Sequence, residues 1–142
     1  MQVLLRWKLG VVVGGGVGAG HEVCLRLGRS GASVLVVDAD AAAAEATAAE
    51  VRRSRVSAWS LQADLATEPH DDQLVAGRAR DLGGADLVIT TGLGARTALG
   101  LGRLLLDDPV LVPGPRDLDG SRTAAAVLGL LRDAAADPVV LL

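Results

Sequence analysis

Seven glycines lie between positions 10 and 28, and they separate a run of valines from an amphipathic stretch. The valines at 11–13 are β-branched and end at glycine, which predicts a buried strand. Beyond the glycines, Ala19, Val23 and Leu27 recur every four residues, which predicts a helix with one apolar face. Glycine allows a tight turn, and the first N–H groups of a helix attract anions. The segment predicts a phosphate cradle, although glycines also occur where a helix merely packs closely on a strand.

The remaining chain repeats the alternation of short apolar runs with helical patterns. Further strands are predicted at residues 33–37, 56–62, 86–90 and 138–142. Helices are predicted at residues 41–53, 67–82, 99–106 and 121–136. Strands that are apolar throughout and alternate with helices predict a five-stranded parallel sheet with helices on both faces. No linker divides the pattern, so we expect one domain over residues 1–142.

Particular residues mark helix starts and a loop. Thr67, followed by Pro69, is typical of the first turn of a helix, and Asp119 or Ser121 is expected to cap the last helix. Residues 107–115 contain three prolines and are expected to form a loop.

Composition excludes several classes of protein. The net charge is −3 and the charges are scattered, so we expect no nucleic-acid partner, because that would need a basic patch. Cys24 is the single cysteine, which excludes an internal disulfide, and together with His21 and His70 it forms no metal-binding pattern. The N-terminus is charged and lacks a cleavage site, and no apolar run is long enough to span a membrane. We therefore expect a cytoplasmic protein with no metal and no membrane partner.

An acid follows the second predicted strand at the distance that a dinucleotide site requires. Asp38 comes 18 positions after Gly20, where a carboxylate accepts hydrogen bonds from the ribose hydroxyls of NAD. The same carboxylate repels the 2′-phosphate of NADP. Positions 17 and 39, where a basic residue would bind that phosphate, hold Val17 and Ala39. The pattern favours NAD over NADP. The alternative is that Asp38 only caps the next helix.

Residues 13–20 (VGGGVGAG) resemble the TGxxxGxG signature of short-chain dehydrogenases/reductases, and the resemblance continues along the chain. Residues 64–65 match the family's D-(V/L) pair near adenine, residues 86–93 (DLVITTGL) its NNAG segment, and residues 117–120 (DLDG) its N-(V/L)-x-G segment. The resemblance implies a Rossmann-like three-layer α/β/α fold that binds a dinucleotide. The cofactor-binding residues that it implies, together with the reasoning on Asp38, are Gly14, Gly16, Val17, Gly18, Ala19, Gly20, Asp38, Ala39, Asp64, Leu65, Thr90, Thr91 and Gly92.

The departures from the family pattern concern its chemistry. The leading threonine is Val13, the two asparagines of NNAG are Thr90 and Thr91, and the helix-start asparagine is Asp117. The family's catalytic serine, tyrosine and lysine have no counterpart, because the chain has no tyrosine and its one lysine is Lys8. The chain thus resembles a truncated nucleotide-binding part of such an enzyme, and we assign no catalytic residue.

Three functions remain open. The chain is an NAD(H)-binding module without activity of its own, an oxidoreductase that is truncated or completed by a partner, or a degenerate scaffold for interactions. Residues 12–19 (VVGGGVGA) are also similar to the dehydrogenase domain of sirohaem synthases, and the chain length is similar to that of nucleotide-binding domains of potassium-channel regulators. Neither class has counterparts of residues 62–65 and 86–93 at these spacings. The last predicted strand, residues 139–142, is expected to be an exposed apolar edge, which predicts a homodimer through that edge.

Overall fold

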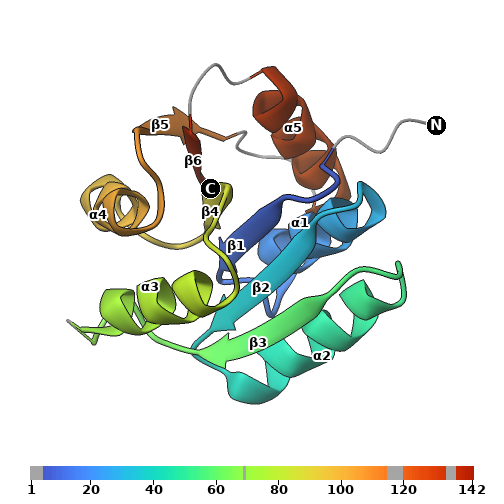
Figure 1. Cartoon of the computed structure of the whole chain (residues 1–142), viewed down its shortest axis with the longest axis horizontal. Coiled ribbons are helices and arrows are strands. Elements are labelled where there is room, and N and C mark those ends of the chain that lie inside the picture. Colours follow the sequence, from blue (N-terminus) through green and yellow to red (C-terminus); the bar gives the residue numbers. More distant parts are fainter. Residues whose placement is uncertain (1–4, 69, 115–119, 134–136) are drawn as a thin grey trace.

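The computed structural model describes residues 5–68, 70–114, 120–133 and 137–142, in which a parallel sheet lies between two layers of helices (Figure 1). Within these residues the sheet has six strands, in the order β3-β2-β1-β4-β6-β5. The strands are β1 (Leu9–Val13), β2 (Ser33–Asp38), β3 (Ala58–Gln62), β4 (Leu87–Thr90), β5 (Pro109–Pro113) and β6 (Asp137–Leu141). The Rossmann-like three-layer α/β/α prediction is confirmed, with one strand more than the five expected.

The additional strand is β5, in the stretch that we expected to be a loop because of its prolines. It pairs with β6 alone and so forms one edge of the sheet. Proline lacks the N–H that a central strand needs, but at the ends of an edge strand the missing donor leaves few ladder bonds unmade. Pro109 and Pro113 stand at the two ends of β5, and the residues between them are apolar.

The prediction that residues 139–142 form an exposed edge is wrong. Strand β6 lies between β4 and β5, and Val139 and Val140 are fully buried. The two outer strands of the usual Rossmann order are therefore exchanged here. A homodimer formed through β6 is excluded by this strand order, because both sides of β6 are already paired.

Five helices cover the two faces of the sheet in the described residues. They are α1 (Gly18–Arg29), α2 (Ala41–Arg52), α3 (Asp71–Asp81), α4 (Ala95–Leu105) and α5 (Gly120–Asp133). Helices α1, α2 and α5 lie on one face, and α3 and α4 on the other (Figure 1). The connection from β5 to β6 runs back toward the centre of the sheet, in the same direction as β1 to β2. Right-handed crossovers then place α5 beside α1.

Alternation along the strands divides the core into two halves. Val12 packs with α1, α2 and α5, whereas Val11 and Val13 pack with α3 and α4. The core is almost entirely Val, Leu and Ala, as expected for a chain whose aromatic residues are two tryptophans. In the described part of the chain, no helix has both the length and the hydropathy needed to cross a lipid bilayer.

One predicted helix start was wrong. Helix α3 begins at Asp71, and Thr67 belongs to the preceding turn, where its hydroxyl donates to Asp64 Oδ2 over 2.7 Å. The predicted roles of Pro69, Asp117 and Asp119 lie outside the described residues, as does the side chain of Ser121.

Candidate dinucleotide site

The predicted site residues gather at the carboxyl ends of β1 to β4. The chain leaves β1 toward β2 on one side, while β4 lies on its other side, so the crevice between the ends of β1 and β4 is a topological switch point. Ligands of open α/β sheets bind at such a point. The glycine-rich turn follows β1, Asp38 ends β2, Asp64 follows β3, and Thr90 ends β4.

The turn after β1 requires glycine at two positions for different reasons. Gly14 has φ 81°, and a Cβ added there would collide with the Thr91 hydroxyl. Gly20 is inside α1, and a Cβ there would collide with the carbonyl of Gly14. Because no side chain lies between Gly20 and Gly14, the first helical turn of α1 packs directly on the backbone of the glycine-rich segment after β1. The glycines thus set both the shape of the cradle and the position of the helix.

The N-terminus of α1 is open to an anion. Its N-cap residue, Val17, is extended and 68% exposed, and its side chain makes no capping hydrogen bond. The first turn contains no acidic residue, so no side chain neutralises the positive end of the helix dipole. The Gly18 and Ala19 N–H groups belong to the first turn, whose donors have no partner within a helix. A helix N-terminus of this kind is able to bind an anion such as a phosphate.

Asp38 joins the cradle to the end of β2. Its Oδ2 accepts a hydrogen bond from the Gly16 N–H and its Oδ1 accepts one from the Asp40 N–H, both over 2.9 Å. The two contacts hold the carboxylate beside the glycine turn. The residue that caps α2 is Asp40, whose Oδ1 accepts from the Ala43 N–H over 3.0 Å. The alternative that Asp38 caps this helix is therefore wrong.

A hollow of about 380 Å³ adjoins Asp38 at the ends of β2 and β3. Ala39 and Asp64, which are among the predicted cofactor-binding residues, line it, and so do Gln62, Glu68 and Asp71, which were not among them. The Gln62 side chain donates to the Ala39 carbonyl over 3.2 Å. Gln62 could have been found, because it ends β3 in register with Asp38, and ends of neighbouring parallel strands share one edge.

The carboxylate of Asp64 is engaged within its own turn. It accepts hydrogen bonds from the N–H groups of Ala66 and Thr67 and from the Thr67 hydroxyl. The Asp64 N–H donates to Asp71 Oδ2 over 2.7 Å. Asp64 thus shapes the wall of the hollow. Leu65 lines a neighbouring hollow of about 300 Å³, together with Arg96 and Thr97 from the start of α4.

The segment after β4 closes the cradle from the other side. The Thr91 hydroxyl donates to the carbonyls of Val13 and Gly14, at 3.2 and 3.3 Å, and the Thr91 N–H donates to Val13 over 2.9 Å. Gly92 follows with φ 73°, a conformation that favours glycine. Threonine therefore does hydrogen-bond in place of the asparagine at position 91.

Thr90 differs from Thr91, because its hydroxyl is buried and has no hydrogen-bond partner among the described residues. Such a group lowers stability and is a reason to look for a functional role. We expect Thr90→Val to raise the free energy of unfolding by about 1 kcal/mol, because valine has the same shape without the unpaired hydroxyl. Urea denaturation measures this change.

Thr47→Val is the matched control. Thr47 is equally buried, but its hydroxyl donates to the Gly16 carbonyl over 3.3 Å, so its removal should lower stability. A Thr90→Val protein that is as destabilised as Thr47→Val would show that the Thr90 hydroxyl has a partner in solution.

Residues 8–100, more than half of the chain, match the family model described as short chain dehydrogenase. The chain belongs to the short-chain dehydrogenase family. The match includes the glycine turn, Asp38, Asp64 and the segment after β4.

Solved short-chain dehydrogenase structures have the same fold. The hydroxysteroid dehydrogenase from Escherichia coli shares 20% identity and a TM-score of 0.70, over 92% of this chain and 69% of that one. A 7α-hydroxysteroid dehydrogenase complexed with NADH shares 18% identity and a TM-score of 0.68, over 91% and 64%. The L-sorbose reductase from Gluconobacter frateurii, complexed with NADPH, shares 18% identity and a TM-score of 0.71, over 92% and 64%. This chain thus spans about two thirds of the length of these proteins.

Other reactive groups of this chain are engaged structurally. Cys24 is fully buried against the glycine turn, and burial raises the pKa of its thiol far above the usual range, so it is no nucleophile. His21 Nε2 lies 3.1 Å from Glu50 Oε1, which ties α1 to α2. In the part of the chain that the structure describes, no group of His, Cys, Asp and Glu could hold a metal ion.

Proposed function

We propose that this chain binds NAD(H) at the cradle between β1, α1 and β2. The observation that carries the proposal is the pairing of an open helix N-terminus with a fixed carboxylate. The N-terminus of α1 offers N–H donors to a pyrophosphate, and Asp38, held by Gly16, offers its remaining lone pairs to ribose hydroxyls. The relatives complexed with NADH and NADPH support a dinucleotide of this class.

The charges around Asp38 support NAD over NADP. The adjoining hollow is lined by Asp64, Glu68 and Asp71 and by no basic residue. A 2′-phosphate placed beside these carboxylates would be repelled, and neither Val17 nor Ala39 can neutralise it. Specificity for NAD here comes from repulsion of the competitor as much as from attraction.

We further propose that the chain is no oxidoreductase by itself. The family's proton transfer uses a tyrosine beside a lysine, and these 142 residues contain no tyrosine and only Lys8, which precedes β1. The second candidate is an oxidoreductase completed by another polypeptide segment, which the family membership favours. Hydride transfer that appears only when a further chain is added would favour this second candidate.

Calorimetric titration with NAD⁺, NADH and NADP⁺ tests the proposal. We expect NAD(H) to bind more tightly than NADP⁺, and Asp38→Ala to weaken NAD(H) by about tenfold, because a charge-assisted hydrogen bond contributes about 1.5–3 kcal/mol. Asp38→Ala should also reduce the difference in affinity between NAD⁺ and NADP⁺, because the carboxylate that repels the 2′-phosphate is gone.

Two controls accompany this titration. Asp107→Ala removes an exposed acid from the loop before β5, away from the cradle, and should leave all affinities unchanged. Asp38→Asn keeps the size of the side chain, so it separates loss of charge from loosening of the Gly16 turn. Absence of binding by any of the three nucleotides to folded protein would refute the proposal and leave the degenerate scaffold as the function.

The oligomeric state and the cytoplasmic location stay predictions. In the part of the chain that the structure describes, the unpaired sheet edges are those of β3 and β5, and Val110 of β5 is 45% exposed, so we expect a homodimer to use one of these edges. Light scattering at high micromolar concentration measures the oligomeric state directly.

A further inference from the structure

A further hollow lies at the opposite edge of the sheet, where the strands begin. It has a volume of about 460 Å³, and we call it the amino-edge groove, after the lining residues Arg6, Trp7, Arg29, Ser33, Arg55 and Ser57. Ser33 is the first residue of β2 and Asp38 is the last. At about 3.3 Å per residue, the groove is roughly 16 Å from the carboxylate of the cradle.

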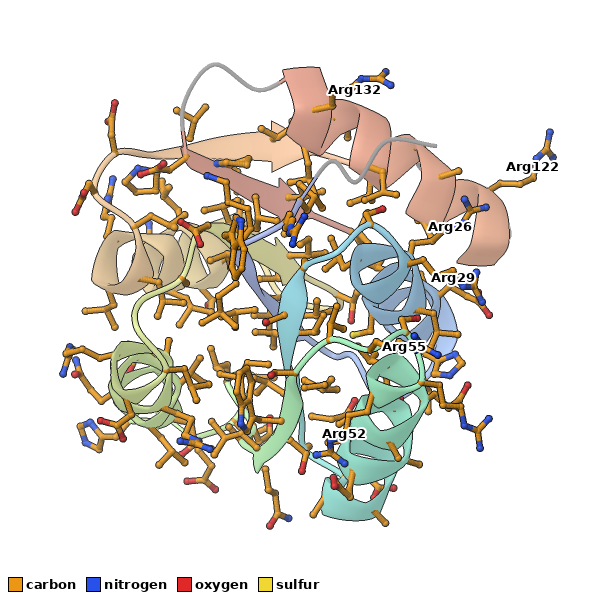
Figure 2. All side chains as sticks on the ribbon, turned by 45° about the vertical axis from the view of Figure 1, so that its right-hand side comes forward. Arg26, Arg29, Arg52, Arg55, Arg122 and Arg132 are labelled. Atoms are coloured by element: carbon orange, nitrogen blue, oxygen red, sulfur yellow. The ribbon has the colours of Figure 1, made fainter. Side chains whose placement is uncertain are left out.

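The groove concentrates positive charge in a chain whose net charge is −3. Three arginines line it and no acidic residue does. Figure 2 shows Arg29 and Arg55 on the same side of the molecule, at the end of α1 and just beyond α2. Within the described chain neither forms a salt bridge, whereas the nearby Arg52 is paired with Glu45 over 2.9 Å. Two guanidinium groups are thus available to an anion.

Strained backbone also lies at this groove. Trp7 has φ 71° and Arg55 has φ 62°, and among the described residues these are the only non-glycine residues with positive φ. Glycine or asparagine would adopt this conformation at less cost. Strained residues cluster at ligand sites, because the surrounding structure holds them in place. Arg29 lies in the last turn of α1, where a positive charge stabilises the negative end of the helix dipole. This effect does not explain Arg55, which lies beyond α2 and has positive φ.

Trp7 provides a flat surface beside the arginines. Its side chain is 86% exposed, and the Arg6 guanidinium lies 5.0 Å from the centre of its ring. A large exposed indole is uncommon away from binding surfaces, and a planar ring of a ligand stacks well on such a face.

We propose that the amino-edge groove binds a nucleoside monophosphate. Its phosphate lies between Arg29 and Arg55, whose planar groups match phosphate oxygens, with Ser33 and Ser57 as further donors. Its base stacks on Trp7. A groove of about 460 Å³ has the size of a small-molecule site. This site is separate from the NAD(H) cradle and does not depend on the proposed function.

Fluorescence of Trp7 tests the proposal. The variant Trp59→Phe leaves Trp7 as the single tryptophan, and it is titrated with AMP, adenosine and inorganic phosphate. We expect saturable quenching by AMP, with weaker binding of adenosine and of phosphate. In the same background, Arg29→Gln with Arg55→Gln should weaken AMP by at least about tenfold. Added NaCl should weaken it as well.

Two variants make the result specific. Arg103→Gln removes an exposed arginine of α4, on the other face of the sheet, and should leave the AMP affinity unchanged. Asp38→Ala alters the NAD(H) cradle, and it should also leave the AMP affinity of the amino-edge groove unchanged. Equal binding of AMP and adenosine, equal affinity of the double arginine variant, or loss of quenching in Asp38→Ala would each overturn the proposal. Phosphate binding as tightly as AMP would overturn the role of Trp7.

Discussion

We expect Gly20→Ala to lower the free energy of unfolding by at least about 3 kcal/mol, a large part of the stability of a domain of this size. The added Cβ would collide with the Gly14 carbonyl and would lie 3.0 Å from the Gly15 Cα. These are backbone atoms, and Gly14 and Gly15 are tied to β2 by N–H donation to the Val37 carbonyl. The turn therefore cannot move aside without breaking its contact with the sheet. Alanine gains only about 1 kcal/mol in helix propensity, which does not offset the collision.

Gly18→Ala is the matched control for this substitution. Gly18 is two residues away, has φ 59°, and has no atom within 4 Å of an added Cβ. Its cost is the conformational strain alone, about 1–2 kcal/mol. Urea unfolding measures both variants. If Gly20→Ala were no less stable than Gly18→Ala, α1 would not pack directly on the glycine turn.

Gly102→Ala and Gly100→Ala should change stability in opposite directions, although both lie in α4. A Cβ on Gly102 would lie 2.5 Å from Val139 Cγ2 and 3.3 Å from Pro109 Cβ. Val139 is fully buried and β-branched, so it cannot rotate away, and we expect a loss of about 2 kcal/mol. A Cβ on Gly100 meets nothing within 4 Å, so its helix propensity should raise stability by about 0.5–1 kcal/mol.

This pair of variants tests the exchanged strand order. The Gly102 collision exists only because β6 lies between β4 and β5, beneath α4. In an order with β5 next to β4, Val139 would not lie under this helix. Stabilisation by Gly102→Ala equal to that by Gly100→Ala would contradict the observed order. Thermal unfolding followed by circular dichroism provides the comparison.

Local patterns predicted the part of the site that depends on neighbours along the chain. The strand, glycine turn and helix of residues 11–27 were found from periodicity, and the structure places them as expected. Asp38 was found from its spacing after the glycines, and its carboxylate does contact the turn through Gly16. The identity of its partners was not predictable, since a contact across 22 residues depends on how α1 packs.

Two errors have a common physical cause. Strand β5 was read as a loop because local rules penalise proline, whereas an edge strand with one neighbour tolerates it. The last strand was then read as an edge, since nothing in its own residues records that β5 covers it. The predicted start of α3 at Thr67 was wrong for a different reason. Thr67 is a typical capping residue, but its hydroxyl donates to Asp64 in the preceding turn.

The sequence by itself determined the alternation of buried strands and helices, the glycine turn after β1 and the acid that contacts it. These features depend on periodicity, on glycine and on short spacings along the chain. Only the tertiary structure decided the order of the last strands, the clamp of Thr91 on Gly14, and the meeting of Arg6, Arg29 and Arg55 in one groove. These features join residues that are far apart in the chain. No local pattern records such contacts, because they depend on how the elements pack once right-handed crossovers have set the face of the sheet that each helix covers.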